Sequence, residues 1–265
     1  MLFFFSRKAF GDDSVLLKHE IAYCLGQMQD PAAVPVLKGL LEDVNEHPVV
    51  RHEAGEALGA IATEECLEIV ERFINDSAIE VRETCEIAAD RIKWILAEKK
   101  NNPEAGKISD IFHTVDPAPA LEEQDHVALG DILADESQPL FHRYRALFTL
   151  RDMNNDKGVE GLLRGCKSQS ALLRHEIAYV LGQLSNPISF DGLKELVENS
   201  TEHPMVRHEA AEAIGALPVL HVEEFLGKFL NDPERIVNES CKVALDISDY
   251  YQSDSLEYAD GVDTN

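Results

Sequence analysis

One dipeptide, histidine followed by glutamate, occurs four times and could do chemistry. Two copies lie 33 residues apart in the first half of the chain, and the pair recurs 156 residues later with the same spacing. The copies are His19-Glu20, His52-Glu53, His175-Glu176 and His208-Glu209. Imidazole nitrogens and carboxylate oxygens are common ligands of transition metals. Such side chains at two nested periods predict metal binding.

Neighbouring copies could share one ion if packed helices carry them. Adjacent residues on an α-helix are about 100° apart around its axis, so a histidine and the next glutamate flank one stripe. Packed helices lie roughly 8–10 Å apart, and two facing histidines can close that gap on a metal ion. His19 and His52 would then hold one ion with a glutamate, and His175 and His208 a second.

Two histidines and one carboxylate form the facial arrangement that leaves positions open on iron(II) for dioxygen and substrate. Each half offers two glutamates where one is needed. The residues alone do not choose between Glu20 and Glu53, or between Glu176 and Glu209. The remaining glutamates could orient a histidine or bind the amine of a cationic substrate. If the halves face each other, the two ions would lie close together.

Longer segments repeat around these pairs and indicate the elements that position them. Leu17–Tyr23 recurs as Leu173–Tyr179, and Glu46–Ala54 recurs as Glu202–Ala210. Units of 31 to 33 residues follow one another, each with two helical patterns separated by a break such as Asp30-Pro31. No segment shows the alternation that a sheet needs. We predict an all-α fold, an α-solenoid of HEAT-like helical-hairpin repeats in two pseudo-symmetric halves.

The expected boundaries follow from these units. Residues 1–97 would form an N-terminal half of three units, and residues 126–252 a C-terminal half of four. Residues 98–125 contain several prolines, which interrupt helices, so we expect a flexible interdomain linker there. Residues 253–265 would be an acidic tail.

Smaller features predict how the helices begin and meet. Each of the four histidines is followed seven residues later, on the same helix face, by a glycine. These glycines are Gly26, Gly59, Gly182 and Gly215. Because glycine costs about 1 kcal/mol in a helix, its recurrence predicts close contact between neighbouring helices. His47 and His203 precede prolines, where helices tend to begin, and we expect them to cap helices or lie at the surface.

The composition limits the partners. With a formal net charge of −25 and a pI near 4.6, the chain would repel nucleic acid and anionic membranes and attract a cationic partner. No apolar stretch approaches the length that spans a membrane. The five cysteines form no CxxC pair, which fits a reducing cytoplasm. No nucleophile elbow, phosphate-binding loop or HExxH motif offers competing chemistry.

The segments Leu17–Gln27 and Val50–Ala60, with their second-half counterparts, closely resemble deoxyhypusine hydroxylase, as do Val115–Pro119 and Tyr258–Gly261. The resemblance covers essentially the whole chain from about Ala9. It implies a cytoplasmic non-haem di-iron monooxygenase with two Fe(2+) ions per chain. The substrates would be dioxygen and the deoxyhypusine side chain of the hypusine-containing translation initiation factor. The basic target loop of that factor suits an acidic enzyme.

The resemblance also assigns roles to the His-Glu pairs. The metal ligands would be His19, His52 and Glu53 for one iron, and His175, His208 and Glu209 for the other. Glu20 and Glu176 would remain as catalytic residues that support the ligands or bind the substrate amine.

The family has four units in each half, whereas the first half here has three. We therefore expect that a first N-terminal repeat is absent from this form. We further expect lower solubility and less complete iron binding than in a form with that repeat.

Two interpretations from other classes remain open at this point. The first is a HEAT-like protein-binding scaffold without catalysis, in which the His-Glu pairs are structural. The second is a dinuclear hydrolase, which would work without oxygen. A single His-Glu pair says little, and a duplicated gene repeats every residue. The repetition inside each half is therefore the feature that favours a metal centre.

Overall fold

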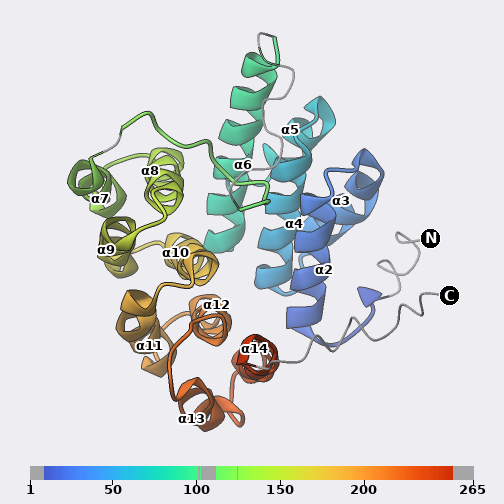
Figure 1. Cartoon of the computed structure of the whole chain (residues 1–265). Helices are drawn as coiled ribbons and strands as arrows, with labels where there is room; N and C mark the ends of the chain where they lie inside the picture. Colours follow the sequence, from blue (N-terminus) through green and yellow to red (C-terminus); the bar gives the residue numbers. More distant parts are fainter. Residues whose placement is uncertain (1–8, 101, 103–111, 124, 253–265) are drawn as a thin grey trace, which may run out of the picture.

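The computed structural model describes residues 9–100, 102, 112–123 and 125–252 (Figure 1). The first half contains α2 (Val15–Gln27), α3 (Val34–Glu42), α4 (Pro48–Ile61), α5 (Glu64–Val70) and α6 (Ile79–Glu98). The second half contains α7 (His126–Ala134), α8 (Leu140–Asp152), α9 (Asp156–Arg164), α10 (Ala171–Leu184), α11 (Phe190–Glu198), α12 (Pro204–Gly215), α13 (Val222–Leu226) and α14 (Arg235–Gln252). Short 3-10 turns are η1 (Pro31–Ala33), η2 (Gly165–Lys167), η3 (Pro187–Ser189) and η4 (Gly227–Phe229).

These elements confirm the predicted all-α fold, since the described residues contain helices and no strand. None of the described helices is long and apolar enough to cross a membrane. The boundaries of the four predicted segments stay predictions, and the tail at 253–265 lies outside the described residues.

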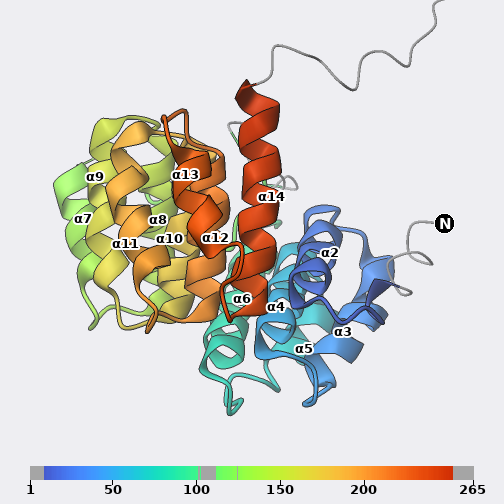
Figure 2. The same ribbon diagram turned by 90° about the horizontal axis from the view of Figure 1, so that it is seen from below.

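Each half has an inner and an outer layer of helices. α2, α4 and α6 pack side by side in the first half, as do α8, α10, α12 and α14 in the second. The shorter helices α3 and α5, and α7, α9, α11 and α13, pack on the outside of these layers. The halves meet where α6 contacts α8 and α10 and where α14 contacts α2 (Figures 1 and 2). The solenoid thus brings the four histidine-bearing helices, α2, α4, α10 and α12, onto facing inner layers.

Side chains at the helix starts determine where these four helices begin. Ser14 caps α2 and Ser170 caps α10, each accepting a hydrogen bond from the backbone N–H three residues on, at 3.1 and 3.0 Å. α4 and α12 begin with proline and are capped by His47 and His203. Their Nδ1 atoms accept hydrogen bonds from the backbone two residues on, at 3.2 and 3.3 Å. The predicted capping role of these two histidines is confirmed.

A basic residue before the histidine anchors α4 and α12 to the outer layer. The buried Arg51 donates from Nε to the carbonyl of Leu41 at 3.0 Å and pairs with Asp76 at 2.7 Å. Arg207 repeats the arrangement in the second half, pairing with Asp232 at 2.6 Å. Because these contacts hold each helix at a fixed rotation about its axis, the following histidine points inward rather than to solvent.

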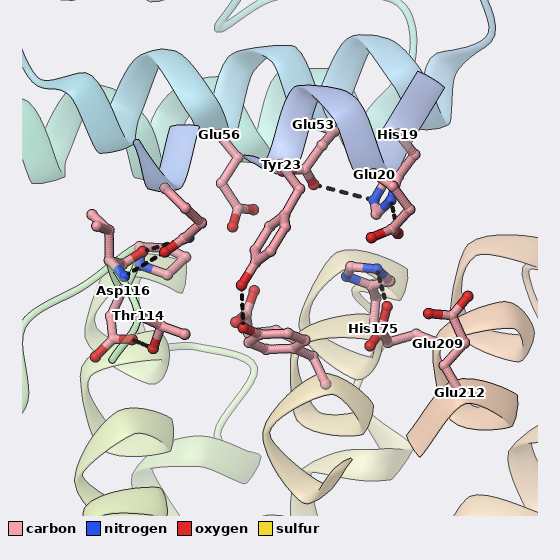
Figure 3. Close-up of a pocket in the computed structure, with 15 residues that line it drawn as sticks. His19, Glu20, Tyr23, Glu53, Glu56, Thr114, Asp116, His175, Glu209 and Glu212 are labelled. Atoms are coloured by element: carbon pink, nitrogen blue, oxygen red, sulfur yellow. Dashed lines mark hydrogen bonds and ion pairs between the residues drawn. The ribbon is translucent and has the colours of Figure 1, made fainter. Parts of the chain in front are cut away.

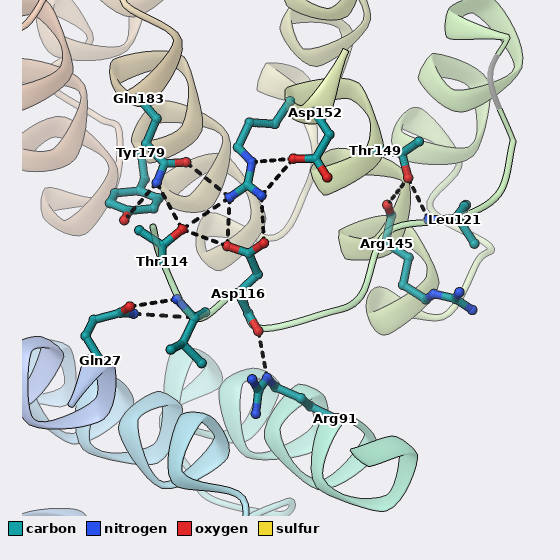
Figure 4. A network of polar contacts seen from close by, with 12 residues as sticks. Gln27, Arg91, Thr114, Asp116, Leu121, Arg145, Thr149, Asp152, Tyr179 and Gln183 are labelled. Carbon is teal, nitrogen blue, oxygen red and sulfur yellow. Dashed lines mark hydrogen bonds and ion pairs between the residues drawn. The ribbon is translucent and has the colours of Figure 1, made fainter. Parts of the chain in front are cut away.

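The connection between the halves is packed rather than loose. We call Thr114–Pro117 the strap (Figure 4). Val115 is buried, and Gln27 of α2 holds it by accepting from its backbone N–H at 2.7 Å and donating to its carbonyl at 3.3 Å. Arg91 of α6 donates to the carbonyl of Asp116 at 2.6 Å. These contacts attach the strap to the first half.

The second half holds the strap through one arginine. Both terminal nitrogens of Arg151 donate to the carboxylate of Asp116, at 2.7 and 2.6 Å, and the Arg151 side chain is fully buried. The prediction of a flexible linker is therefore wrong for the strap. Prolines do prevent a helix there, but the extended backbone finds polar partners in both halves and is ordered by them.

The recurrent glycines mark close helix contacts, as predicted. A Cβ atom added to Gly26 would lie 2.7 Å from the Cα atom of Ala57, and one added to Gly59 would lie 2.8 Å from the Cβ atom of Ala88. The second-half glycines are equally crowded, with distances of 3.0 Å at Gly182 and 2.4 Å at Gly215. Backbones of neighbouring inner helices can approach this closely only where a side chain is missing.

This geometry predicts opposite effects for two glycine substitutions. Gly59→Ala should lower the free energy of unfolding by roughly 1–3 kcal/mol, because α4 and α6 must separate to admit the methyl group. Gly39→Ala should raise it by up to about 1 kcal/mol, because nothing lies within 4 Å of the added atom and alanine favours the helix. Urea unfolding of both variants measures the difference. Equal stabilities would show that the α4–α6 contact is not tight.

Candidate metal centre

The four histidines of the predicted centre meet at one place. Rings on neighbouring helices lie 5.5 Å apart for His19 and His52 and 5.4 Å apart for His175 and His208, measured between centroids. Rings from opposite halves are as close, at 5.2 Å for His19 and His208 and 5.5 Å for His52 and His175. Facing inner layers thus place imidazoles from both halves around a common point.

Glutamates lie among these rings, and the two halves treat them alike. Glu53 Oε2 on α4 is 3.1 Å from His19 Nε2 on the neighbouring α2. The equivalent Glu209 Oε2 on α12 is 3.4 Å from His175 Nε2 on α10. Glu20 instead contacts the other nitrogen of His19, with Oε1 3.0 Å from Nδ1 (Figure 3). Of the two glutamates in each half, Glu53 and Glu209 therefore face the ring of the adjacent helix.

Three groups of these side chains bring one ligand atom each to within 4.8 Å of the others. The groups are His19, His52 and His175; His175, His208 and Glu209; and His52, Glu53 and Glu56. They overlap and draw on both halves, whereas the sequence suggested one separate set per half. The donors are imidazoles and carboxylates, which suit iron and other divalent transition metals.

Unpartnered ring nitrogens indicate that something binds here. His52 and His208 are fully buried. Among the described residues, His52 Nε2 and both ring nitrogens of His175 and of His208 are buried without a hydrogen-bond partner. Buried polar atoms are normally paired, because desolvating them otherwise costs free energy. A metal ion would satisfy these nitrogens, so the residues present fit the group that the pattern predicts.

Burial shifts the protonation of the centre strongly. It lowers the pKa of His175 to about 3, with His19 adding to the effect, and lowers that of His52 and His208 well below the ordinary value of 6.5. Burial, reinforced by neighbouring carboxylates, raises the pKa of Glu209 to about 8. Neutral imidazoles are the form that binds a metal, and a divalent cation would restore the charge of the carboxylates.

These shifts predict how pH affects the stability of the metal-free protein. Between pH 6.5 and 8, glutamates of the unfolded chain are ionised, whereas Glu56 and Glu209 in the folded chain hold their protons up to about pH 8. Folding takes up protons in this window, so stability should fall as the pH rises, by roughly 1 kcal/mol per pH unit for each such group. The histidines with a lowered pKa act in the opposite direction only below their ordinary value of 6.5.

Thermal unfolding at pH 6.5, 7.2 and 8 measures this effect. The metal-free chain should melt at a lower temperature at each step, and the metal-loaded chain should change less, since bound cations keep the carboxylates ionised. A melting temperature that rises with pH in the metal-free chain would show that these glutamates are ionised throughout.

The sequence patterns missed two glutamates that line the same cavity. Glu56 and Glu212 lie one helical turn after Glu53 and Glu209, and each contributes to its lining. Their spacing of 156 residues was a signal that the His-Glu pattern did not include. Figure 3 shows Glu56 beside Tyr23, and Glu212 beyond Glu209.

A tyrosine pair and the strap complete the cavity. The hydroxyls of Tyr23 and Tyr179, which come from opposite halves, are hydrogen-bonded at 2.6 Å. Thr114, Asp116 and other strap residues line the wall beside this pair (Figures 3 and 4). The cavity is therefore built from both halves and from the segment that joins them.

Comparisons with known proteins agree with this architecture and site. The HEAT repeat family matches residues 7–90 and 127–215. Human deoxyhypusine hydroxylase is 48% identical over 256 residues, which cover 97% of this chain and 83% of the human protein. The enzyme of the same name from Candida albicans is 45% identical over 257 residues, 95% of this chain and 80% of that protein. The structure of human deoxyhypusine hydroxylase in complex with glycerol superposes with a TM-score of 0.88, covering 94% of this chain and 84% of that one.

Proposed function

The chain belongs to the deoxyhypusine hydroxylase family, and on this premise we propose that it hydroxylates deoxyhypusine in the hypusine-containing translation initiation factor. The observation that carries the proposal is the meeting of four buried imidazoles and their glutamates in one cavity between the halves. The substrate is a protein side chain, so the enzyme must accept a loop of its partner at this cavity. The net charge of −25 favours the approach of a basic loop.

We further propose that the cavity holds two iron ions and that dioxygen is the oxidant. The ligands are His19, His52 and Glu53 for one ion, and His175, His208 and Glu209 for the other. When bound, iron supplies the activation of dioxygen that C–H hydroxylation requires. Support for this assignment comes from the contacts of Glu53 and Glu209 with the histidine of the adjacent helix.

The chain's own residues prepare the site in three ways. The inner helices keep the histidines neutral and buried, so that their nitrogens are free to bind metal. Glu20 and Glu176 lie in the same cavity and offer carboxylates to the ammonium of the substrate. Glu20 also hydrogen-bonds to His19 Nδ1, which orients that ring.

A protein-binding scaffold without catalysis is not favoured. A scaffold would gain nothing from burying imidazole nitrogens without partners, and such groups are rare in folded proteins because they destabilise them. The relatives that carry this sequence over most of their length are enzymes.

One experiment tests the function and the metal together. The chain is loaded with ferrous iron without oxygen, its iron is quantified, and it is mixed with the deoxyhypusine-containing factor with or without dioxygen. We expect two iron ions per chain and a mass gain of one oxygen atom on the factor, only when dioxygen is present. A zinc-loaded chain is the control, since zinc has no redox chemistry. Equal hydroxylation by the zinc-loaded or metal-free chain would refute the proposal.

A further inference from the structure

The cavity carries more negative charge than the metal ligands explain. Six of the fifteen residues that line it are glutamates, and none of the fifteen is a lysine or an arginine. The proposed function uses Glu53 and Glu209 as ligands and gives Glu20 and Glu176 to the substrate. It leaves two further carboxylates in the cavity without a role. They are Glu56 and Glu212.

These two glutamates are placed as a related pair. Each lies three residues, about one turn, after a proposed ligand on its own inner helix, Glu56 on α4 and Glu212 on α12. Figure 3 shows the Glu56 side chain directed into the cavity beside Tyr23. Within the described part of the chain, Glu212 Oε1 is buried and has no hydrogen-bond partner. A carboxylate oxygen in this position lacks the cation or donor that burial ordinarily requires.

Each of the two has a charged neighbour from the opposite half. After burial, Glu56 is the group that most raises the pKa of Glu176 on α10. Glu20 on α2 likewise raises the pKa of Glu212, after burial and Glu209. The unassigned glutamates therefore form two cross-half pairs, Glu56 with Glu176 and Glu20 with Glu212. Two carboxylates that face one another without a cation repel, so each pair is suited to hold one positive charge.

The chemistry of the substrate supplies two such charges. A deoxyhypusine side chain carries a secondary ammonium and a terminal primary ammonium, joined by a four-carbon chain. Two divalent ions balance four of the six cavity glutamates, and a diammonium chain balances the remaining two. An ammonium bound by two carboxylates makes charge-assisted hydrogen bonds, which are the stronger kind.

We propose that Glu56 and Glu212 are substrate-binding residues, each completing a carboxylate pair for one of the two ammonium groups of an aminobutyl-amine chain. This inference rests on the proposed function for its substrate and extends it to a ligand class. Free polyamines that contain the aminobutyl-amine unit should bind in the same cavity. Spermidine contains this unit, whereas n-butylamine offers only one ammonium.

The test measures binding rather than turnover. The iron-loaded chain is titrated with spermidine, and with n-butylamine as a mono-ammonium control, by calorimetry without oxygen. Spermidine should bind at least roughly 10-fold more tightly than n-butylamine, because it engages both pairs. Glu56→Gln and Glu212→Gln should each weaken spermidine binding by roughly 10-fold or more while keeping iron at the wild-type ratio. Glu160→Gln on the outer helix α9 is exposed, removes the same charge, and should change neither.

The outcomes separate this inference from the proposed function. Loss of iron from Glu56→Gln or Glu212→Gln would make these residues metal ligands and overturn the inference. Unchanged spermidine affinity in both variants would overturn it as well. If a glutamine variant does not fold, the aspartate variant at the same position is titrated instead, and wild-type affinity there would count against the inference. A wild-type chain that binds iron and spermidine but does not hydroxylate the factor would refute only the proposed function.

Discussion

Replacing His52 with alanine is expected to remove iron and hydroxylation together. The imidazole of His52 is fully buried, and its Nε2 has no hydrogen-bond partner in the described part of the chain. In the proposed centre it is one of three protein ligands to an ion. Losing a ligand should weaken metal affinity by more than the roughly 10- to 100-fold that follows from losing a residue that only supports one. Iron per chain after desalting, and turnover of the deoxyhypusine-containing factor, are the two measurements.

The control for this variant lies on the same helix. His47 caps α4 through Nδ1, which accepts from the backbone N–H of Val49, and the ring does not line the cavity. His47→Ala should therefore cost about 1 kcal/mol of stability and leave the iron content unchanged. Full iron and full turnover in His52→Ala would remove His52 from the ligand set. Equal iron loss in both variants would point to unfolding of α4 rather than to coordination.

The histidines could be found from the sequence because their signal is a period. His19 and His52 recur at the spacing of a helical repeat, and a solenoid places equivalent positions on adjacent helices. The choice of glutamate could not be made in this way, since Glu20 and Glu53 have the same motif. It depends on helix rotation, which the contact of Arg51 with the outer layer controls.

Two other features depended on packing between segments far apart in the chain. Glu56 repeats at the same 156-residue spacing as the ligands, but a glutamate on a helix ordinarily faces solvent. Only the facing of the two inner layers puts it in a cavity. The strap shows the same limit. Its prolines indicate a break in the helices, whereas its order comes from Gln27, Arg91 and Arg151, which no local pattern links to it.

The ion pair between Asp116 and Arg151 predicts a large loss of stability in Asp116→Ala. Arg151 is completely buried and gives two hydrogen bonds to this carboxylate, at 2.7 and 2.6 Å. Removing one partner of a buried pair leaves the other charge desolvated, which costs roughly 3–5 kcal/mol. Arg151 retains a contact with Asp152 at 2.8 Å, so we expect the lower end of this range, about 3 kcal/mol. Urea unfolding of the metal-free chain measures it.

A second ion pair provides the matched control and a second readout gives the consequence for the site. Asp131→Ala breaks the contact of Asp131 with Arg164, both largely exposed, and should cost less than about 1 kcal/mol. Asp116 also lines the cavity, and the strap is bonded to both halves, so Asp116→Ala should release iron faster than Asp131→Ala does. The carbonyl of Asp116 keeps its bond to Arg91 in the variant, and the change therefore reports the carboxylate alone. If Asp116→Ala unfolds at the same urea concentration as Asp131→Ala and keeps its iron as long, the strap does not hold the two halves of the centre together.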